Sequence, residues 1–325
     1  MSKDSFKTDI IIPVYKPGEE FLRLVERLLP ESEYIEKLII INTEEELMPH
    51  ELYLKLKAMG EADSSPLFGK LKLIHIKKAD FDHAATRRMG VSYSNAEFFI
   101  FMTDDALPYD DRLIRELLRP FCNENIALSY ARQLPREDCR EAERFTRAFN
   151  YPPESRIKTA KDLESLGIKA FFASDVCCAY RRSTYDRLGG LTDHAIFNED
   201  MIYARKVIDS GYGISYTASA KVIHSHNYGP MEQFKRNFDL GLSQAEHGEV
   251  FGGIRSEGEG IRLVKSTALH LLKTGRPLGL IGLFFSSAAK YSGYIAGKNY
   301  RRLPKSLIRA FTGNRTYVDK YITGP

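Results

Sequence analysis

Runs of apolar residues alternate with amphipathic segments through the N-terminal third of the 325-residue chain. Four runs rich in β-branched or aromatic residues predict strands that are buried on both faces: Thr8–Tyr15, Lys37–Asn42, Leu71–Ile76 and Glu97–Thr103. Between them, apolar positions at helical spacing predict helices at 19–29, Leu47–Met59 and Ala84–Ser94. This alternation with short joins predicts an α/β domain with a parallel sheet and right-handed crossovers.

The pattern is less regular in the middle of the chain. A polar stretch with three prolines, Gln133–Glu164, predicts a long irregular excursion, a feature that is usually functional or mobile. On either side of this stretch, the sequence predicts a helix at 112–121, a strand at Ile126–Ala131, a strand-like segment at Lys169–Tyr180 that is broken at Ser174-Asp175, and two short strands within Tyr212–His224. Helices are expected at 181–190, directly after Glu199-Asp200, and at 231–241.

The C-terminal part has a different character. After Gly252-Gly253 the longest apolar stretch is Leu278–Ala296, which contains Lys290 and is followed by the basic sequence KNYRRLPK. Its length is near the lower limit for spanning a bilayer, so a helix that packs on the core or lies at an anionic membrane surface is the favoured interpretation. We therefore expect a catalytic domain at 1–250 and a helical, membrane-associating region at 251–325.

Composition narrows the possible functions. A net charge of only +4 does not point to nucleic acid, and the spacing of the four cysteines does not suggest zinc or require an oxidising compartment. The N-terminal residues MSKDSFKTD lack the apolar run of a signal peptide, so a cytoplasmic location is expected.

Candidate chemistry begins where the fourth strand ends, at Asp104 and Asp105. Open α/β sheets bind ligands at the carboxyl ends of their strands, and two adjacent acids there suit a cation or a ligand rich in donors. A plain surface turn is the alternative. The loop after the first strand, VYKPGEE, is neither GxGxxG nor GxxxxGK[ST], which disfavours the usual dinucleotide and ATP sites. Tyr15 could stack on a base there or simply pack at the strand end.

Three other polar groups are candidates for the same site. His83 and Arg87 share a helix face, where Arg87 suits a phosphate, although His83 could instead cap the helix. Glu199-Asp200 precedes a helix and could be catalytic or only stabilise its first turn. His224 and His226 have a spacing that suits a metal, with ordinary hydrogen bonding as the alternative.

Six motifs in order resemble those of family 2 glycosyltransferases with the glycosyltransferase-A fold: TDIIIPVY, FDHAATRRMG, FMTDDALP, FNEDM, HSHN and QFKRNF. The segments FNYPPESR, GIKAFFASDVCCAYRR and KYSGYIAGKNYRRLPK are more similar to the bacterial rhamnosyltransferases of that family, which use dTDP-L-rhamnose. The resemblance covers nearly the whole chain. It implies a Rossmann-like, mixed but mainly parallel sheet that is flanked by helices and followed by a C-terminal helical extension.

The resemblance assigns one group of residues to the sugar-nucleotide donor: Pro13, Val14, Tyr15, Asn42, His83, Arg87, Asp104, Gln233 and Arg236. Two positions depart from the family pattern. Asn42 stands where an aspartate usually contacts the base, which leaves the identity of the base open. Asn237 stands where tryptophan usually follows the matched arginine, so only Gln233 and Arg236 are carried over.

The remaining roles concern the metal and the chemical step. The resemblance implies that Asp105 binds Mg²⁺ or Mn²⁺, with His226 or His224 completing the metal shell. It implies that Asp200 is the general base, with Glu199 as the alternative. The function expected is inverting transfer of L-rhamnose from dTDP-β-L-rhamnose to a saccharide acceptor, expected to be lipid-linked, at the inner face of the cell membrane. A UDP- or GDP-sugar donor and a non-catalytic sugar-nucleotide-binding relative are the alternatives.

Overall fold

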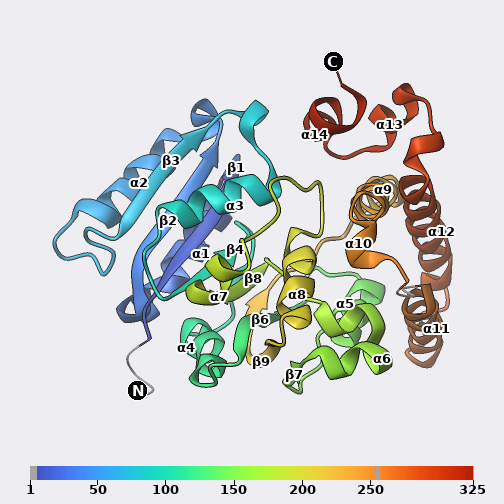
Figure 1. Cartoon of the computed structure of the whole chain (residues 1–325), viewed down its shortest axis with the longest axis horizontal. Coiled ribbons are helices and arrows are strands. Elements are labelled where there is room, and N and C mark those ends of the chain that lie inside the picture. Colours follow the sequence, from blue (N-terminus) through green and yellow to red (C-terminus); the bar gives the residue numbers. More distant parts are fainter. Residues whose placement is uncertain (1–5, 254–256, 325) are drawn as a thin grey trace.

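The fold is a single large sheet with helices on both faces and a helical C-terminal part along one side (Figure 1). The computed structural model describes residues 6–253 and 257–324. The strands are β1 Thr8–Tyr15, β2 Ile35–Thr43, β3 Leu71–Ile76, β4 Phe98–Met102, β5 Leu107–Pro108, β6 Ile126–Leu134, β7 Arg156–Lys158, β8 Cys177–Arg181 and β9 Gly213–Ile223. All nine belong to one sheet.

Fourteen α-helical segments are found in the described part of the chain. Those up to residue 209 are α1 Glu19–Leu28, α2 His50–Glu61, α3 His83–Ser92, α4 Leu113–Leu118, α5 Glu141–Asn150, α6 Leu163–Leu166, α7 Arg182–Arg187 and α8 Glu199–Asp209. The later ones are α9 Pro230–Glu246, α10 Gly248–Phe251, α11 Glu257–Lys273, α12 Gly279–Lys298, α13 Lys305–Phe311 and α14 Arg315–Tyr317.

The sheet is mixed, with the strand order β3-β2-β1-β4-β8-β6-β9-β5 and with β7 paired to β9. The four N-terminal strands pair in parallel, and β6 is parallel to β9. Strand β8 runs antiparallel to both β4 and β6, so it joins the two parallel parts. The carboxyl ends of β1, β2 and β4 therefore meet at one edge, where such sheets bind ligands.

Alternate residues of β1 enter two hydrophobic cores on opposite faces of the sheet. Ile10 and Ile12 pack with the apolar residues of α1, α2 and α4. Ile11 packs on the other face with residues of α3 and α8. Because both faces of the strand are covered, its sequence is an almost continuous apolar run rather than an alternating one.

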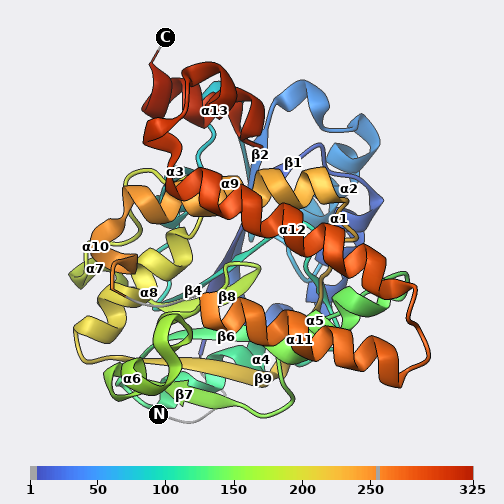
Figure 2. The same ribbon diagram turned by 90° about the vertical axis from the view of Figure 1, so that its right-hand side faces the viewer.

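The C-terminal helices pack on α9, and α12 crosses it at very short range. A Cβ atom added at Gly293 or Gly297 would overlap the backbone carbonyl oxygen of Phe234 or Phe238, respectively. Only glycine permits this approach. Figure 2 shows α11 and α12 as an outer layer that covers α9 and α5 on this side. No helix in the described residues combines the length and apolar character needed to cross a bilayer.

The sequence predicted the N-terminal strands and helices well but misjudged three later segments. Gln133–Glu164 is not wholly irregular, since it contains α5 and β7. In Lys169–Tyr180 only the second half enters a strand, because the segment up to Phe171 forms a 3₁₀ turn. The two strands expected in Tyr212–His224 are one strand, β9, whose break appears only as an irregular register against β6.

Candidate active site

The ends of β1 and β4 are joined at the two neighbouring acids. The backbone N–H of Tyr15 donates to Oδ2 of Asp104 across 3.3 Å. Burial and the adjacent charge of Asp105 raise the pKa of Asp104 to about 6. Asp104 thus faces the end of β1, whereas Asp105 faces the end of β9.

Asp105 lies against two histidines from the end of β9. Its carboxylate oxygens are 3.2 Å from Nε2 of His226 and 3.5 Å from Nε2 of His224. The two Nε2 atoms are themselves 3.1 Å apart. Burial disfavours ionisation of Asp105, but the hydrogen bond with His226 and the proximity of His224 outweigh it and hold its pKa below the usual range.

These three side chains fit a divalent cation. They offer a carboxylate oxygen and two imidazole nitrogens that converge within 4.8 Å of one another, and they form one candidate metal cluster among the described residues. Neighbouring ligands around an ion with bonds of about 2.1 Å stand about 3 Å apart. The separations of 3.1 to 3.5 Å are close to that value.

A second layer of contacts orients His224. Its Nδ1 lies 3.1 Å from Oε1 of Gln133, which is an acceptor because the same oxygen also receives a hydrogen bond from Arg147. Nδ1 therefore carries the hydrogen, and Nε2 turns its lone pair toward Asp105. Burial lowers the pKa of His224 to about 3, which keeps the ring neutral. Partners of this kind orient metal-binding histidines.

The start of α8 places the second acidic pair. Asn198 precedes the helix in the left-handed conformation, with φ of 64°, a region that asparagine tolerates better than most residues. Glu199 is buried and its Oε1 lies 2.8 Å from the guanidinium of Arg87. The same guanidinium lies 3.3 Å from Asp175. Arg87 is thus held by two buried carboxylates, at the edge of a cavity at the ends of β1, β2 and β4.

Asp200 has different surroundings from its neighbour. Its Oδ2 accepts a hydrogen bond from the backbone N–H of Asp175 at 3.1 Å. Burial, followed by the charges of Glu199 and Asp175, raises the pKa of Asp200 well above its ordinary value. A carboxylate with a raised pKa is a stronger base, which is the property a general base needs at neutral pH.

A cavity of about 360 Å³ opens at the ends of β1, β2 and β4. Its walls are Pro13, Val14, Tyr15, Thr43, Lys78, Phe81, His83, Arg87, Thr103, Asp104, Asn314 and Thr316. We call this cavity the nucleotide pocket, after the ligand that the resemblance of the sequence leads us to expect there. It combines aromatic rings with polar atoms that could bind a base and a ribose. The hydroxyl of Thr43 is buried and has no hydrogen-bond partner among the described residues, so it is available to a ligand.

The structure brings most of the sequence-predicted donor residues to the pocket, but not all of them. Pro13, Val14, Tyr15, His83, Arg87 and Asp104 line it. Asn42 is fully buried and does not, because its Nδ2 is bonded to the carbonyl of Glu44 and to Nδ1 of His75. The cap of α3 is Asp82, which accepts from two backbone N–H groups, so His83 does not have that role.

A stack of side chains connects Arg236 on α9 with the candidate metal site, the metal cluster formed by Asp105, His224 and His226. The guanidinium of Arg236 lies over the ring of Tyr228 at 4.8 Å, and that ring stacks on His226 with centroids 4.8 Å apart. Arg236 is exposed and has no carboxylate partner among the described residues. It is therefore a cation that an anionic ligand could approach. Gln233 is half-buried one turn earlier on the same helix.

The sequence did not predict several residues of the site. Asp175 and Gln133 act only as partners of other side chains, although the polar interruption Ser174-Asp175 in an apolar run was a usable signal. Asn314 and Thr316 reach the pocket from the C-terminal segment. This segment is fastened by Asp239 on α9, which accepts from the hydroxyl of Thr312 at 2.7 Å and from the N–H of Gly313 at 2.9 Å.

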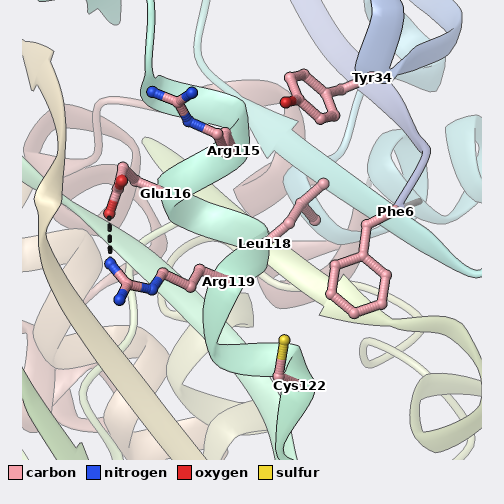
Figure 3. A pocket seen from close by; sticks show the side chains of 7 residues that line it. All are labelled: Phe6, Tyr34, Arg115, Glu116, Leu118, Arg119 and Cys122. Atoms are coloured by element: carbon pink, nitrogen blue, oxygen red, sulfur yellow. Dashed lines mark ion pairs between the residues drawn. The ribbon is translucent and has the colours of Figure 1, made fainter. Parts of the chain in front are cut away.

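Another hollow lies between the N-terminal residues and α4 (Figure 3). It is lined by Phe6, Tyr34, Arg115, Glu116, Leu118, Arg119 and Cys122. Glu116 and Arg119 are paired with each other at 3.7 Å. This hollow contains none of the candidate site residues, and we assign it no role in the reaction.

Comparison with known proteins defines the class. The sequence pattern described as Glycosyl transferase family 2 matches residues 9–189, which is more than half of the chain. O-antigen chain rhamnosyltransferase RfbN of Salmonella typhimurium is 36% identical over 319 residues, which cover 96% of each chain. O-antigen chain rhamnosyltransferase WbaN of Salmonella anatum is 39% identical over 249 residues, covering 75% of this chain and 78% of that protein.

Solved structures agree on the fold. The mannosyltransferase PcManGT from Pyrobaculum calidifontis, in complex with GDP-Man and Mn²⁺, has a TM-score of 0.54 at 11% identity and covers 99% of this chain and 89% of its own. TarS 1–349 of S. aureus in complex with UDP has a TM-score of 0.51 at 12% identity and covers 91% and 92%. At such identities the likeness concerns the fold alone, which is the glycosyltransferase-A fold.

The protein is a glycosyltransferase that belongs to glycosyl transferase family 2. Among known proteins it is similar over almost its full length to an O-antigen rhamnosyltransferase.

Proposed function

We propose that the protein is an inverting rhamnosyltransferase of cell-surface polysaccharide synthesis. It would move L-rhamnose from dTDP-β-L-rhamnose to a hydroxyl group of a saccharide acceptor that is carried by a lipid. The observation that carries the proposal is the match over 96% of both chains to RfbN, an O-antigen chain rhamnosyltransferase. The site supports it with a nucleotide pocket, a candidate cation site and a separate, half-buried carboxylate, Asp200.

The nucleotide pocket would hold the thymidine part of the donor. Tyr15 is exposed at the pocket wall and can stack on the base, while the unpartnered hydroxyl of Thr43 can bond its edge. Asp104 faces the pocket and suits the ribose hydroxyls. Pro13 and Val14 would supply backbone contacts. Asn42 would act indirectly, by supporting the loop after β2 through its bond to the carbonyl of Glu44.

The diphosphate would lie between the pocket and the metal cluster. Asp105, His224 and His226 would hold Mg²⁺ or Mn²⁺, which when bound would supply positive charge for the departing diphosphate. Arg236 and Gln233 would approach the same group from α9, and His83 would approach from the start of α3. Arg87 would serve mainly to hold Glu199 and Asp175 in place, because its guanidinium is already committed to them.

Asp200 would take the proton of the acceptor hydroxyl. Its raised pKa favours proton uptake, and its carboxylate is held by the N–H of Asp175 rather than by a cation. An attack that a base assists on the face opposite the leaving diphosphate inverts the anomeric carbon. The product would thus be an α-rhamnoside. Glu199 is a poorer candidate, since it is paired with Arg87.

We assign the chemistry to residues 1–250 and place the enzyme at the inner face of the cell membrane, with the helices of 251–325 nearest the lipid. Asn314 and Thr316 return from that region to the pocket. A UDP- or GDP-sugar donor is the rival proposal, and the buried position of Asn42 favours neither base. A relative that binds the nucleotide without transfer is the other alternative.

One assay separates these proposals. The full-length protein is incubated with Mn²⁺ and, in turn, dTDP-rhamnose, a UDP-sugar and a GDP-sugar, and release of the nucleoside diphosphate is measured with and without a lipid-linked glycan acceptor. We expect release from dTDP-rhamnose, stimulated by the acceptor and abolished by a chelator. Release from another donor instead would support the rival, and nucleotide binding without release would indicate the non-catalytic relative.

The base is tested by Asp200→Asn, with Asp193→Asn as the matched control. Asp193 is an exposed aspartate that lies shortly before the same helix. We expect the first variant to lose at least about a hundredfold in kcat, the scale of general-base catalysis, and the second to keep its activity. Near-normal turnover in a folded Asp200→Asn protein would contradict the assignment of Asp200 as the general base.

A further inference from the structure

The α11–α12 pair, which forms the outer layer in Figure 2, has several large apolar side chains exposed at its surface. Leu278, in the turn between the two helices, is 82% exposed, and Phe284 on α12 is 67% exposed. We call the hairpin face the set formed by Leu269, Leu272, Leu278, Ile281, Phe284 and Phe285, all more than half exposed. Contiguous exposed apolar side chains on this scale mark interaction surfaces.

The charge around the hairpin face is mostly of one sign. Two glutamates stand in the first turn of α11, and one of them, Glu259, is paired with Lys169 and Arg262. From Gly260 to Val318 the chain contains no aspartate or glutamate, but it contains eleven lysines and arginines. Lys265 and Lys273 on α11 and Lys298 on α12 are exposed, and no carboxylate within 6–253 or 257–324 forms an ion pair with them. An apolar surface bordered by unpaired lysines suits a partner that is apolar inside and anionic outside.

The hairpin is held firmly, so its apolar side chains cannot simply fold inward. Glu141 on α5 accepts from His270 at 2.8 Å and from Arg276 at 2.8 Å. Gly293 and Gly297 lock α12 onto the backbone of α9. The inner sides of both helices thus pack against α5 and α9, and the hairpin face remains directed outward.

A second copy of the chain fits this face poorly. A two-fold dimer places the same patch of both subunits together, so the lysines of one copy would face those of the other. The hairpin face offers no carboxylate that could compensate them. A bilayer that contains anionic lipids meets both requirements, since its phosphates match the lysines and its acyl chains match the apolar side chains.

We propose that the hairpin face docks on an anionic lipid bilayer, with Leu278, Phe284 and Phe285 entering the boundary between headgroups and acyl chains. The pair of helices lies on the membrane and does not cross it, in agreement with the lack of a membrane-crossing helix among the described residues. The docking does not depend on which sugar is transferred, so it can be tested apart from the proposed function.

The test is sedimentation of the full-length protein with vesicles of phosphatidylcholine alone or mixed with phosphatidylglycerol. We expect binding to the mixed vesicles only, weakened by salt. The double variant Phe284→Ser/Phe285→Ser should bind at least about tenfold more weakly. Its control is Leu54→Ser/Phe68→Ser, which removes two exposed apolar side chains from another part of the molecule and should bind like the wild type. Lys265→Glu/Lys273→Glu should also bind more weakly.

Three results would overturn the proposal. Equal sedimentation of the wild type and Phe284→Ser/Phe285→Ser, with both folded by circular dichroism, would remove the hairpin face from the interface. Equal binding to neutral and anionic vesicles would remove the role of the lysines. A concentration-dependent dimer in analytical ultracentrifugation that the same double variant abolishes would assign the face to a second copy of the chain. Release of nucleoside diphosphate by the double variant, with a water-soluble acceptor, should be unchanged.

Discussion

Glu199 and Asp200 are adjacent in the chain but have separate structural roles. Glu199 is buried against the guanidinium of Arg87, so its charge is matched. Asp200 has no ion pair with a cation among the described residues, and burial raises its pKa. Successive residues of a helix point about 100° apart, so the start of α8 directs the two side chains to these different surroundings. The same substitution at the two positions should therefore affect different properties.

We expect Glu199→Gln to lower the free energy of unfolding by about 1–3 kcal/mol, because the charge of Arg87 would keep only Asp175 as its partner. Asp200→Asn should leave it unchanged or higher, because a neutral amide replaces a carboxylate whose ionised form is disfavoured by burial. Urea unfolding of both variants measures the difference. Equal loss of stability in the two would contradict the division of roles.

Lys158 gives a prediction about pH. It lies on β7, is almost fully buried, and donates to the hydroxyl of Tyr130 at 3.1 Å. Burial lowers its pKa from the ordinary 10.5 to about 7. Between these values the unfolded chain binds the extra proton, so the free energy of unfolding should rise with pH.

Lys158→Met should flatten this rise, whereas Lys161→Met, which alters an exposed lysine nearby, should retain it. Denaturant unfolding at several pH values in the lower part of the window between 7 and 10.5 provides the measurement. In this lower part of the window the tyrosines of the unfolded chain, whose pKa is about 10, remain protonated and do not contribute to the slope. A rise of equal slope in Lys158→Met would show that another group is responsible.

At this scale the sequence predicted the residues whose type is tied to a chemical task. Strand-end position and spacing made Asp105, His224 and His226 candidates, the resemblance assigned them to a metal, and the structure brings them together. Gln133 was not foreseen, because a glutamine in a polar stretch has no pattern of its own. Asp175 had a signal, since it interrupts an apolar run, but that signal does not say which side chain it contacts. The resemblance assigned Asn42 to the base, and in the structure its amide bonds to the carbonyl of Glu44 and to His75.

At the scale of elements, the crossing of α9 and α12 depends on small residues. Gly293 and Gly297 allow the two backbones to touch, and Gly241 on α9 faces them with equally little room. The sequence showed these glycines within an apolar stretch. It could not show which helix they approach, since that depends on the folding of segments far apart in the chain.

Gly297→Ala should lower the free energy of unfolding by about 1–3 kcal/mol, because the new methyl group would overlap the backbone of α9. Gly282→Ala is the matched control on the same helix. A Cβ there meets open space, so the higher helix propensity of alanine should stabilise by about 0.5–1 kcal/mol. Thermal unfolding of the two proteins gives opposite shifts if the crossing is as tight as described.

The segment between α13 and α14 is a second element whose place decides its role. It is fastened by Asp239, and α14, which follows it directly, presents Thr316 to the nucleotide pocket. Thr316→Val keeps the shape of the side chain and removes its hydroxyl. We expect the KM for the donor to rise about fivefold, the value of one hydrogen bond, with the KM for the acceptor unchanged. An unchanged donor KM would exclude a direct contact.

Elements in the N-terminal third were predictable, because their strands are buried on both faces and their helices have a clear apolar stripe. Segment Gln133–Glu164 was misjudged because its prolines and charges dominate the stretch, although α5 has apolar residues at helical spacing, at Ala142, Phe145 and Phe149. The strand in Lys169–Tyr180 was overextended because apolar residues in a 3₁₀ turn resemble those of a strand.

At the scale of the whole molecule, the nucleotide pocket and the metal cluster should be linked in binding. The metal and the donor diphosphate would share one location, so each should strengthen the binding of the other. We expect dTDP and Mn²⁺ together to raise the melting temperature more than the sum of their separate effects. At a hundredfold excess over Kd such binding contributes about 2.7 kcal/mol.

Asp105→Asn should abolish this mutual effect, and a chelator should reverse it in the wild type. Asp111→Asn, which changes an exposed aspartate in the loop that follows, should behave like the wild type. Differential scanning fluorimetry compares the three proteins. Additive shifts in the wild type would contradict a metal shared with the nucleotide.

The tight crossing of α9 and α12 also fixes the distance between the bilayer and the active site. With the hairpin face on the bilayer, α12 and α9 stand between the lipid and the site, and each helix is about 10 Å thick. Because the two backbones touch, this spacing cannot be compressed or stretched by sliding side chains. An acceptor rooted in the membrane would reach Asp200 only when its glycan is long enough to span that gap. The enzyme would then select acceptors by the length of their glycan as well as by its chemistry, and acceptors with shorter glycans would not be modified.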